Sequence, residues 1–181
     1  MTTTQLLASI RSKLQDGIKS RHSDYHIMNV SYVLKGEVKT SCTVLRRITE
    51  NAIWFNTDYR SQKITAIKDN NKACIHFYSK KDKTQISIQC TLKIHHNDEL
   101  SKAGWDQSSL LAKQCYRQIG SPCESFDVEK MQQKLPLDQA YNNFATIEAE
   151  MEKSDVLFLK FAGHERYIIN MKTHEVERIL P

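Results

Sequence analysis

Glycine and proline are scarce in this 181-residue chain, with 5 and 3 copies respectively. This scarcity excludes collagen-like repeats and proline- and glycine-rich disordered segments. No apolar run approaches the ~20 residues that span a bilayer, and the opening residues MTTTQLLASI lack the basic start of a secretory signal. We therefore expect one globular, cytoplasmic domain with no membrane contact.

Cysteine pairs at metal-binding or redox spacing are also missing. The five cysteines are odd in number and include no CxxC motif, which predicts reduced structural thiols. His95, His96 and His164 are not spaced with Cys or carboxylates as a metal site requires, so we expect no bound metal. The net charge of +5 comes from scattered Lys and Arg, and we expect no nucleic-acid partner.

The hydrophobic pattern divides the chain into four consecutive parts. Residues 1–20 have helical spacing, and residues 25–97 read as the main barrel strands. Residues 98–151 read as a helical insertion that includes a helix over 137–151, and residues 155–181 read as closing strands. Short turns between the strands predict antiparallel pairing. We expect a single, mainly β domain, a small closed barrel with peripheral helices.

The polar residues that carry chemistry gather where a strand ends and a helix starts. Asn56 and Thr57 close the predicted strand, and Ser61, Gln62 and Lys63 open the helix that follows. Hydroxyl groups, a lysine and free backbone N–H groups at a helix N-terminus form an anion site. The sequence therefore predicts a ligand that carries a phosphate.

Several segments together resemble a known family. The segment TVLRRITENAIWFNTDYRSQK is followed, 22 positions after Lys63, by Gln85 in KTQISIQ. The helix segment WDQSSLLAKQCYRQIG and the C-terminal HERYIIN and ERILP continue the likeness. Over about residues 25–181 the chain resembles the FMN-binding split barrels of the pyridoxamine 5′-phosphate oxidase type. The resemblance implies a homodimer with FMN at the subunit interface.

The resemblance also implies roles for single residues. Arg46 and Lys63 would bind the FMN phosphate with support from Thr57 and Ser61, and Gln85 would contact the pyrimidine edge of the ring. Arg166 would reach the ring from the partner subunit. The full set of expected cofactor contacts is Arg46, Asn56, Thr57, Ser61, Gln62, Lys63, Gln85 and Arg166.

The chain departs from the family pattern on both sides of the expected site. Ser41 stands where an arginine usually begins the phosphate cradle, and Gln62 replaces a basic residue that Arg60 could substitute. In the family, an RxHxR segment binds the substrate, and here Ala162 replaces its first arginine. The expected substrate contacts are His164 and Arg166, together with Arg117, which aligns only loosely with the family's substrate-phosphate site.

Three functions stay open at this stage, and the sequence identifies no catalytic residue. The first is an FMN-dependent oxidase or reductase of a small molecule, phosphorylated or not, in which the flavin performs the redox chemistry. The second is a non-catalytic or regulatory FMN-binding protein that has lost the substrate-phosphate site, which Ala162 favours. The third is a barrel that binds haem, another cofactor or only a protein partner.

Overall fold

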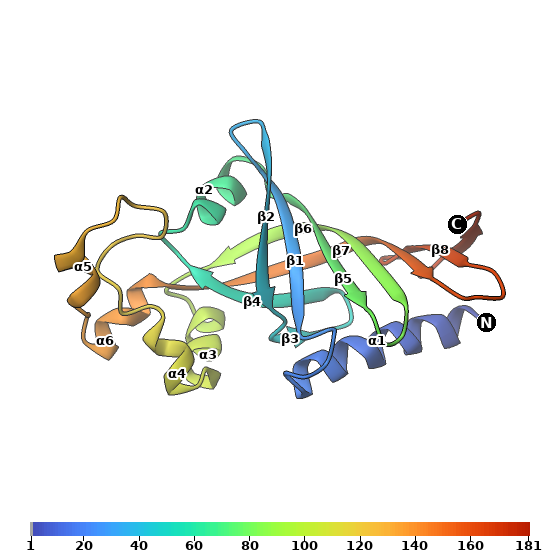
Figure 1. Ribbon diagram of the computed structural model, residues 1–181, viewed down its shortest axis with the longest axis horizontal. Helices are drawn as coiled ribbons and strands as arrows, with labels where there is room; N and C mark the ends of the chain where they lie inside the picture. The colour runs from blue at the N-terminus through green and yellow to red at the C-terminus, as the bar shows by residue number, and fades with distance from the viewer. Residues whose placement is uncertain (1) are drawn as a thin grey trace.

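The computed structural model describes residues 2–181, so Met1, the first residue of the predicted N-terminal helical segment, lies outside this range. Within it, one antiparallel sheet curls around a hydrophobic core and helices lie at its ends (Figure 1). The strands are β1 (Ile27–Leu34), β2 (Glu37–Val44), β3 (Arg47–Ile48), β4 (Ala52–Asp58), β5 (Lys72–Ser79), β6 (Thr84–His95), β7 (Phe144–Phe158), β8 (Glu165–Asn170) and β9 (Val176–Ile179).

The strand order produces the barrel. It runs β2-β1-β5-β6-β7-β4-β3, and β8 pairs with the second half of β7 and with β9. The strand β2, at one end of this order, contacts β4 near the other end. The sheet therefore closes by contact rather than by a continuous hydrogen-bond ladder, and the mainly β class expected from the sequence is confirmed.

The barrel interior is filled by alternate residues of each strand. On β6, Ile86, Ile88 and Cys90 are almost fully buried, while Ser87 and Gln89 between them are more accessible. The N-terminal helix α1 (Thr3–Lys19) lies against this core through an apolar stripe that includes Leu6. The predicted pattern of residues 1–20 and of the strands in residues 25–97 is present in the structure.

The predicted helix over residues 137–151 is wrong. Only α6 (Leu137–Ala140) and a 3-10 turn (Tyr141–Asn143) are helical, and β7 begins at Phe144. The helical insertion therefore ends at residue 143 rather than 151, and β7 extends through the beginning of the predicted closing strands. Because β7 pairs with β4 and β8 on one side and with β6 on the other, tertiary hydrogen bonds override its helical propensity.

The remaining helices lie near the C-terminal end of β4. The helix α2 (Gln62–Asp69) follows β4 directly and contacts β1, and α3 (Glu99–Gln107) packs on β7. The short helices near it, coloured yellow to orange in Figure 1, complete the insertion. The two short helices that follow α3 are α4 (Leu110–Gln114) and α5 (Val128–Gln132). Among residues 2–181, no helix is both long and apolar enough to cross a bilayer.

Candidate functional site

The junction between β4 and α2 gathers hydroxyl groups around a helix N-terminus. Thr57, near the end of β4, is buried, and its Oγ1 lies 3.4 Å from Oγ of Ser61. Ser61 is the N-cap residue of α2, but its side chain makes no capping hydrogen bond. The first-turn N–H groups of α2 therefore lack a side-chain acceptor, and such groups bind anions.

Lys63, a largely buried residue, adds a positive charge to this junction. Its residue exposure is 8%, and its Nζ lies 5.4 Å from the centre of the Phe55 ring. Within residues 2–181, no carboxylate or hydrogen-bond acceptor pairs with this ammonium group. Burial lowers the pKa of Lys63 because the charged form is poorly solvated there. The hydroxyl, ammonium and helix N–H donors of the junction match the acceptor oxygens of a phosphate group.

Arg46 and Asn56 belong to a neighbouring cavity of about 310 Å³ between the sheet and α3. Adjacent strand residues point to opposite faces, so Asn56 and Thr57 are directed to different sides of β4. Oδ1 of Asn56 accepts a hydrogen bond of 3.2 Å from Oγ1 of Thr146, which also lines the cavity. The predicted cofactor contacts near β4 therefore form two groups, one on each side of the strand.

Arg47 and Trp54, which the sequence does not mark as functional, also line this cavity. The guanidinium of Arg47 lies 4.0 Å from the Trp54 ring centre, and the ring of His95 stacks on Trp54 at 5.5 Å. His95 lies between Asp98, at 2.9 Å, and Glu148, at 3.3 Å. The only sequence signal for Trp54 is its position two residues before Asn56 in β4, because side chains two residues apart lie on the same face of a strand.

Tyr116 connects Arg46 with the helical insertion. Burial raises the pKa of the Tyr116 phenol, and the positive charge of Arg46 acts on it in the opposite direction. The ring of Tyr116 packs against Trp105 and Phe144. The phenol is therefore neutral near pH 7 and is held by a rigid aromatic cluster beside the cavity.

Gln85 and Arg166 lie together at the other end of β7. Both pair with Leu157, on β6 and β8 respectively, whereas Thr57 pairs with Ala145. Twelve residues separate these two β7 positions, which corresponds to about 40 Å along an extended strand. Arg166 donates to both carboxylate oxygens of Asp155, at 2.9 and 2.6 Å. A single chain therefore does not bring Gln85 and Arg166 to the junction with Lys63.

Two arginines and one glutamine that we expected near the phosphate or the substrate each have a different environment in the structure. Arg60 binds both oxygens of Asp58 and two backbone carbonyls, so its N–H donors are engaged within the chain. That Arg60 compensates for Gln62 stays a prediction. Gln62 is exposed at the start of α2. Arg117 donates to the backbone oxygen of Leu135 at 2.6 Å, which gives it a structural contact.

Ser41, which replaces a family arginine, and His164, an expected substrate contact, lie in β2 and in a turn respectively. Ser41 lies in β2, and its buried Oγ has no hydrogen-bond partner among residues 2–181. His164 is exposed in the turn between β7 and β8, directly before Glu165. Neither position brings a positive charge to the β4–α2 junction.

Comparison with sequence families gives one match over the first half of the chain. Residues 8–96 match the family described as pyridoxamine 5′-phosphate oxidase, FMN-binding domain. This range contains the β4–α2 junction, the Arg46 cavity and Gln85. The cofactor of the matching domain is FMN, as the sequence resemblance implied. A comparison with curated proteins found no match.

Solved structures share the fold along nearly the whole chain. A pyridoxamine 5′-phosphate oxidase-related, FMN binding protein from Nostoc punctiforme is 20% identical, with 96% of each chain covered and a TM-score of 0.79. PhzG from Burkholderia lata, in complex with tetrahydrophenazine-1-carboxylic acid, is 13% identical, with 98% of this chain and 92% of PhzG covered and a TM-score of 0.76. This chain belongs to the pyridoxamine 5′-phosphate oxidase-like family of FMN-binding split barrels.

Proposed function

We propose that this protein binds FMN with its phosphate at the N-terminus of α2 and uses it as an oxidoreductase. The observation that carries the proposal is Lys63, a residue with 8% exposure whose ammonium group has no anionic partner within residues 2–181. A phosphate carries up to two negative charges and several acceptor oxygens, so it would pair with Lys63, the two hydroxyl groups and the α2 N–H groups at once.

The rest of the cofactor site would require a second copy of the chain. Gln85 and Arg166 lie far along β7 from Lys63, whereas one FMN molecule is much shorter than this length of strand. In a homodimer, the Gln85 and Arg166 of one subunit could meet the Lys63 junction of the other. This arrangement agrees with the interfacial FMN that the sequence resemblance implied. It places Gln85 on the same subunit as Arg166.

The residues around the Arg46 cavity support a catalytic role. When bound, FMN supplies the capacity to accept a hydride from a substrate. Arg46 and Asn56 contribute a positive charge and an amide to a cavity that Trp54 also lines. A small molecule with acceptor groups and a planar body fits this set of side chains. We infer that the substrate occupies this cavity and that Arg46 orients it.

The second function that the structure favours is non-catalytic FMN binding. Arg117 is engaged by a backbone carbonyl, and Ala162 leaves the RxHxR segment without its first arginine. These features argue against recognition of a substrate phosphate as in pyridoxamine 5′-phosphate oxidation.

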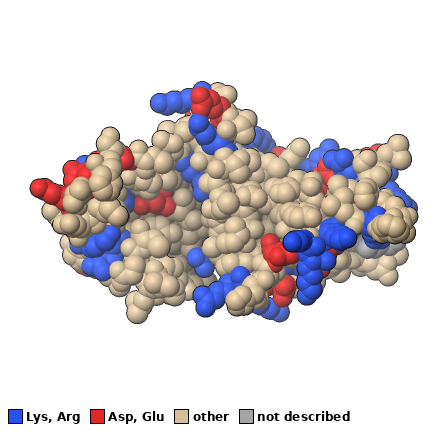
Figure 2. Space-filling model, in the orientation of Figure 1, with Lys and Arg blue, Asp and Glu red and all other residues tan. Residues whose placement is uncertain are grey.

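The charges visible on one face of the molecule are dispersed in small groups, which supports a small-molecule ligand rather than nucleic acid (Figure 2).

An absorbance titration combined with a turnover assay tests the proposal. Purified protein is titrated with FMN and then supplied with pyridoxamine 5′-phosphate, or with reduced nicotinamide nucleotides as electron donors. We expect flavin binding, and bleaching of the bound flavin by at least one donor. Flavin binding without bleaching by any donor would favour the non-catalytic function, and absence of flavin binding would contradict both functions.

All five cysteines are free, which supports a reducing compartment such as the predicted cytoplasm.

A further inference from the structure

A second cavity lies between α1 and the barrel, away from the proposed cofactor site. Its volume is about 500 Å³, within the ~300–1,000 Å³ range of small-molecule sites. Apolar side chains from α1, β6, β7 and the residue that follows β8 form most of its wall, including Leu7, Ile88, Met151 and Met171. The cavity is therefore large and apolar enough to hold an organic molecule.

One buried polar group in this wall lacks a partner. Ser154 of β7 lines the cavity with a residue exposure of 1%, and its Oγ makes no hydrogen bond within residues 2–181. Buried hydroxyl groups in folded proteins nearly always have a partner, so an unsatisfied one requires an explanation. A polar atom of a bound molecule would provide that partner.

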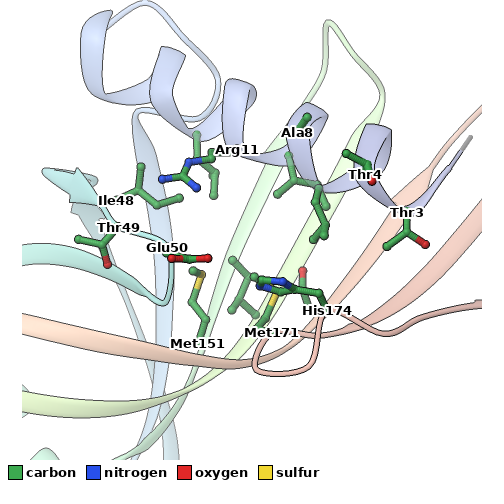
Figure 3. Close-up of a pocket in the computed structure, with 15 residues that line it drawn as sticks. Thr3, Thr4, Ala8, Arg11, Ile48, Thr49, Glu50, Met151, Met171 and His174 are labelled. Carbon is green, nitrogen blue, oxygen red and sulfur yellow. The ribbon is translucent and has the colours of Figure 1, made fainter.

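Three charged or polar side chains surround the mouth of the cavity. Arg11 extends from α1, Glu50 comes from the turn before β4, and His174 comes from the turn between β8 and β9 (Figure 3). Within residues 2–181, Arg11 forms no ion pair and no side-chain hydrogen bond, although Glu50 shares its cavity. His174 has a φ of 61°, a left-handed conformation that is uncommon for a non-glycine residue.

These contacts define the chemistry of an occupant. An apolar wall favours an apolar body, and the free guanidinium of Arg11 favours a carboxylate, which it can bind through two parallel N–H groups. Glu50 disfavours additional negative charge, so a dianionic phosphate fits less well than a monocarboxylate. We propose that the cavity beneath α1 is a second ligand site, distinct from the FMN site, that binds a monocarboxylic acid with an apolar body.

Successive side chains of a strand point to opposite faces of the sheet, and this separates the cavity beneath α1 from the proposed cofactor contacts. Ile88 and Ser154 face the barrel interior, whereas Gln85 lies on the more accessible face of β6. None of the residues that form the β4–α2 junction or the Arg46 cavity lines the cavity beneath α1. Occupancy of the two sites should therefore be independent at the level of direct contact.

Calorimetric titration with decanoate and with decan-1-ol tests the proposal on the full-length protein. The two probes have the same chain length and differ in the carboxylate. We expect decanoate to bind at least tenfold more tightly than decanol to the wild-type protein. Arg11→Gln should remove this preference, whereas Arg21→Gln, at an exposed arginine outside the cavity, should retain it.

A second titration with saturating FMN distinguishes the two sites. Unchanged decanoate affinity in the presence of FMN, together with the Arg11→Gln effect, would support a separate site. Absence of decanoate binding, equal affinity in Arg11→Gln and wild-type protein, or displacement of FMN by decanoate would each overturn the proposal. If the protein binds no FMN at all, the first titration still decides whether the cavity beneath α1 is a ligand site.

Discussion

The ammonium group of Lys63 lies 5.4 Å from the centre of the Phe55 ring and has no carboxylate partner within residues 2–181. The ring face gives it a weak electrostatic contact, which does not replace the water lost on burial. A charge kept in such a place without an ion pair is a cost to folding that a bound anion would relieve. This relationship makes Lys63 the centre of the proposed phosphate site.

Replacement of Lys63 tests its role in cofactor binding. Lys63→Ala removes a positive charge from a site for a dianion, and we expect FMN affinity to fall at least tenfold. Lys68→Ala on the same helix is the matched control, because Lys68 is exposed and contacts Tyr59. Flavin fluorescence quenching gives both dissociation constants. Equal affinity in Lys63→Ala and wild-type protein would remove Lys63 from the site.

The pKa of Lys63 predicts a pH-dependent stability of the cofactor-free protein. Burial lowers this pKa in the folded state, whereas the unfolded chain has a value of about 10.4. The unfolded state therefore holds the proton more tightly, so the destabilisation is complete below the folded pKa and disappears as pH approaches the unfolded value.

Lys63→Met should consequently raise the Tm of the cofactor-free protein at neutral pH, and the gain should decrease above about pH 10, near the unfolded lysine value. Thermal denaturation across this pH range, with Lys68→Met as the control, measures the effect. A lower Tm for Lys63→Met at neutral pH would show that the ammonium group of Lys63 stabilises the cofactor-free protein.

Gly104 allows α3 to approach β7 beside the Arg46 cavity. A Cβ at this position would lie 2.5 Å from Oγ1 of Thr146, which is itself bonded to Asn56. Gly104→Ala should destabilise the fold by about 1–3 kcal/mol, although alanine normally favours a helix. Gly120→Ala is the control, because its nearest contact would be 3.5 Å. Urea denaturation that shows equal or greater stability for Gly104→Ala would contradict the close packing.

A mixture of two defective subunits tests the proposed homodimer and its shared site. Lys63→Ala and Arg166→Ala homodimers should each bind FMN weakly, because every site loses one contact. A heterodimer of the two variants should regain about one intact site, since its unmodified Lys63 and Arg166 can meet at one interface. Flavin stoichiometry of purified heterodimers measures this recovery. Heterodimers that bind no better than either parent would mean that Lys63 and Arg166 do not share a cofactor.

Local sequence patterns predicted the β4–α2 junction but not the whole arrangement around it. The strand ending in Thr57 and the helix beginning near Lys63 follow from residues close in sequence. The β7 strand was misread because Phe144, Ile147 and Met151 also fit a helical period, and the adjacent Ala and Glu residues favour helix. Only pairing with distant strands decides in favour of β structure.

The positions of individual arginines could not be predicted for a related reason. Arg60 and Arg117 have the chemistry of phosphate ligands, but both donate to backbone carbonyls of the insertion. The Gln118 carbonyl lies 58 residues from Arg60, and the Leu135 carbonyl lies 18 residues from Arg117. Arg166 is similarly engaged by Asp155, through cross-strand neighbours on β7 and β8. The availability of a guanidinium depends on these tertiary partners, which no local motif specifies.

The most direct test of the phosphate site compares FMN with riboflavin, which lacks the phosphate. Dissociation constants for both flavins are measured by fluorescence titration of wild-type and Lys63→Ala protein. We predict that the wild-type protein binds FMN in the micromolar range or better and riboflavin at least tenfold more weakly, and that Lys63→Ala narrows this difference. Equal affinity for the two flavins, or no binding of FMN, would contradict a phosphate site at the N-terminus of α2.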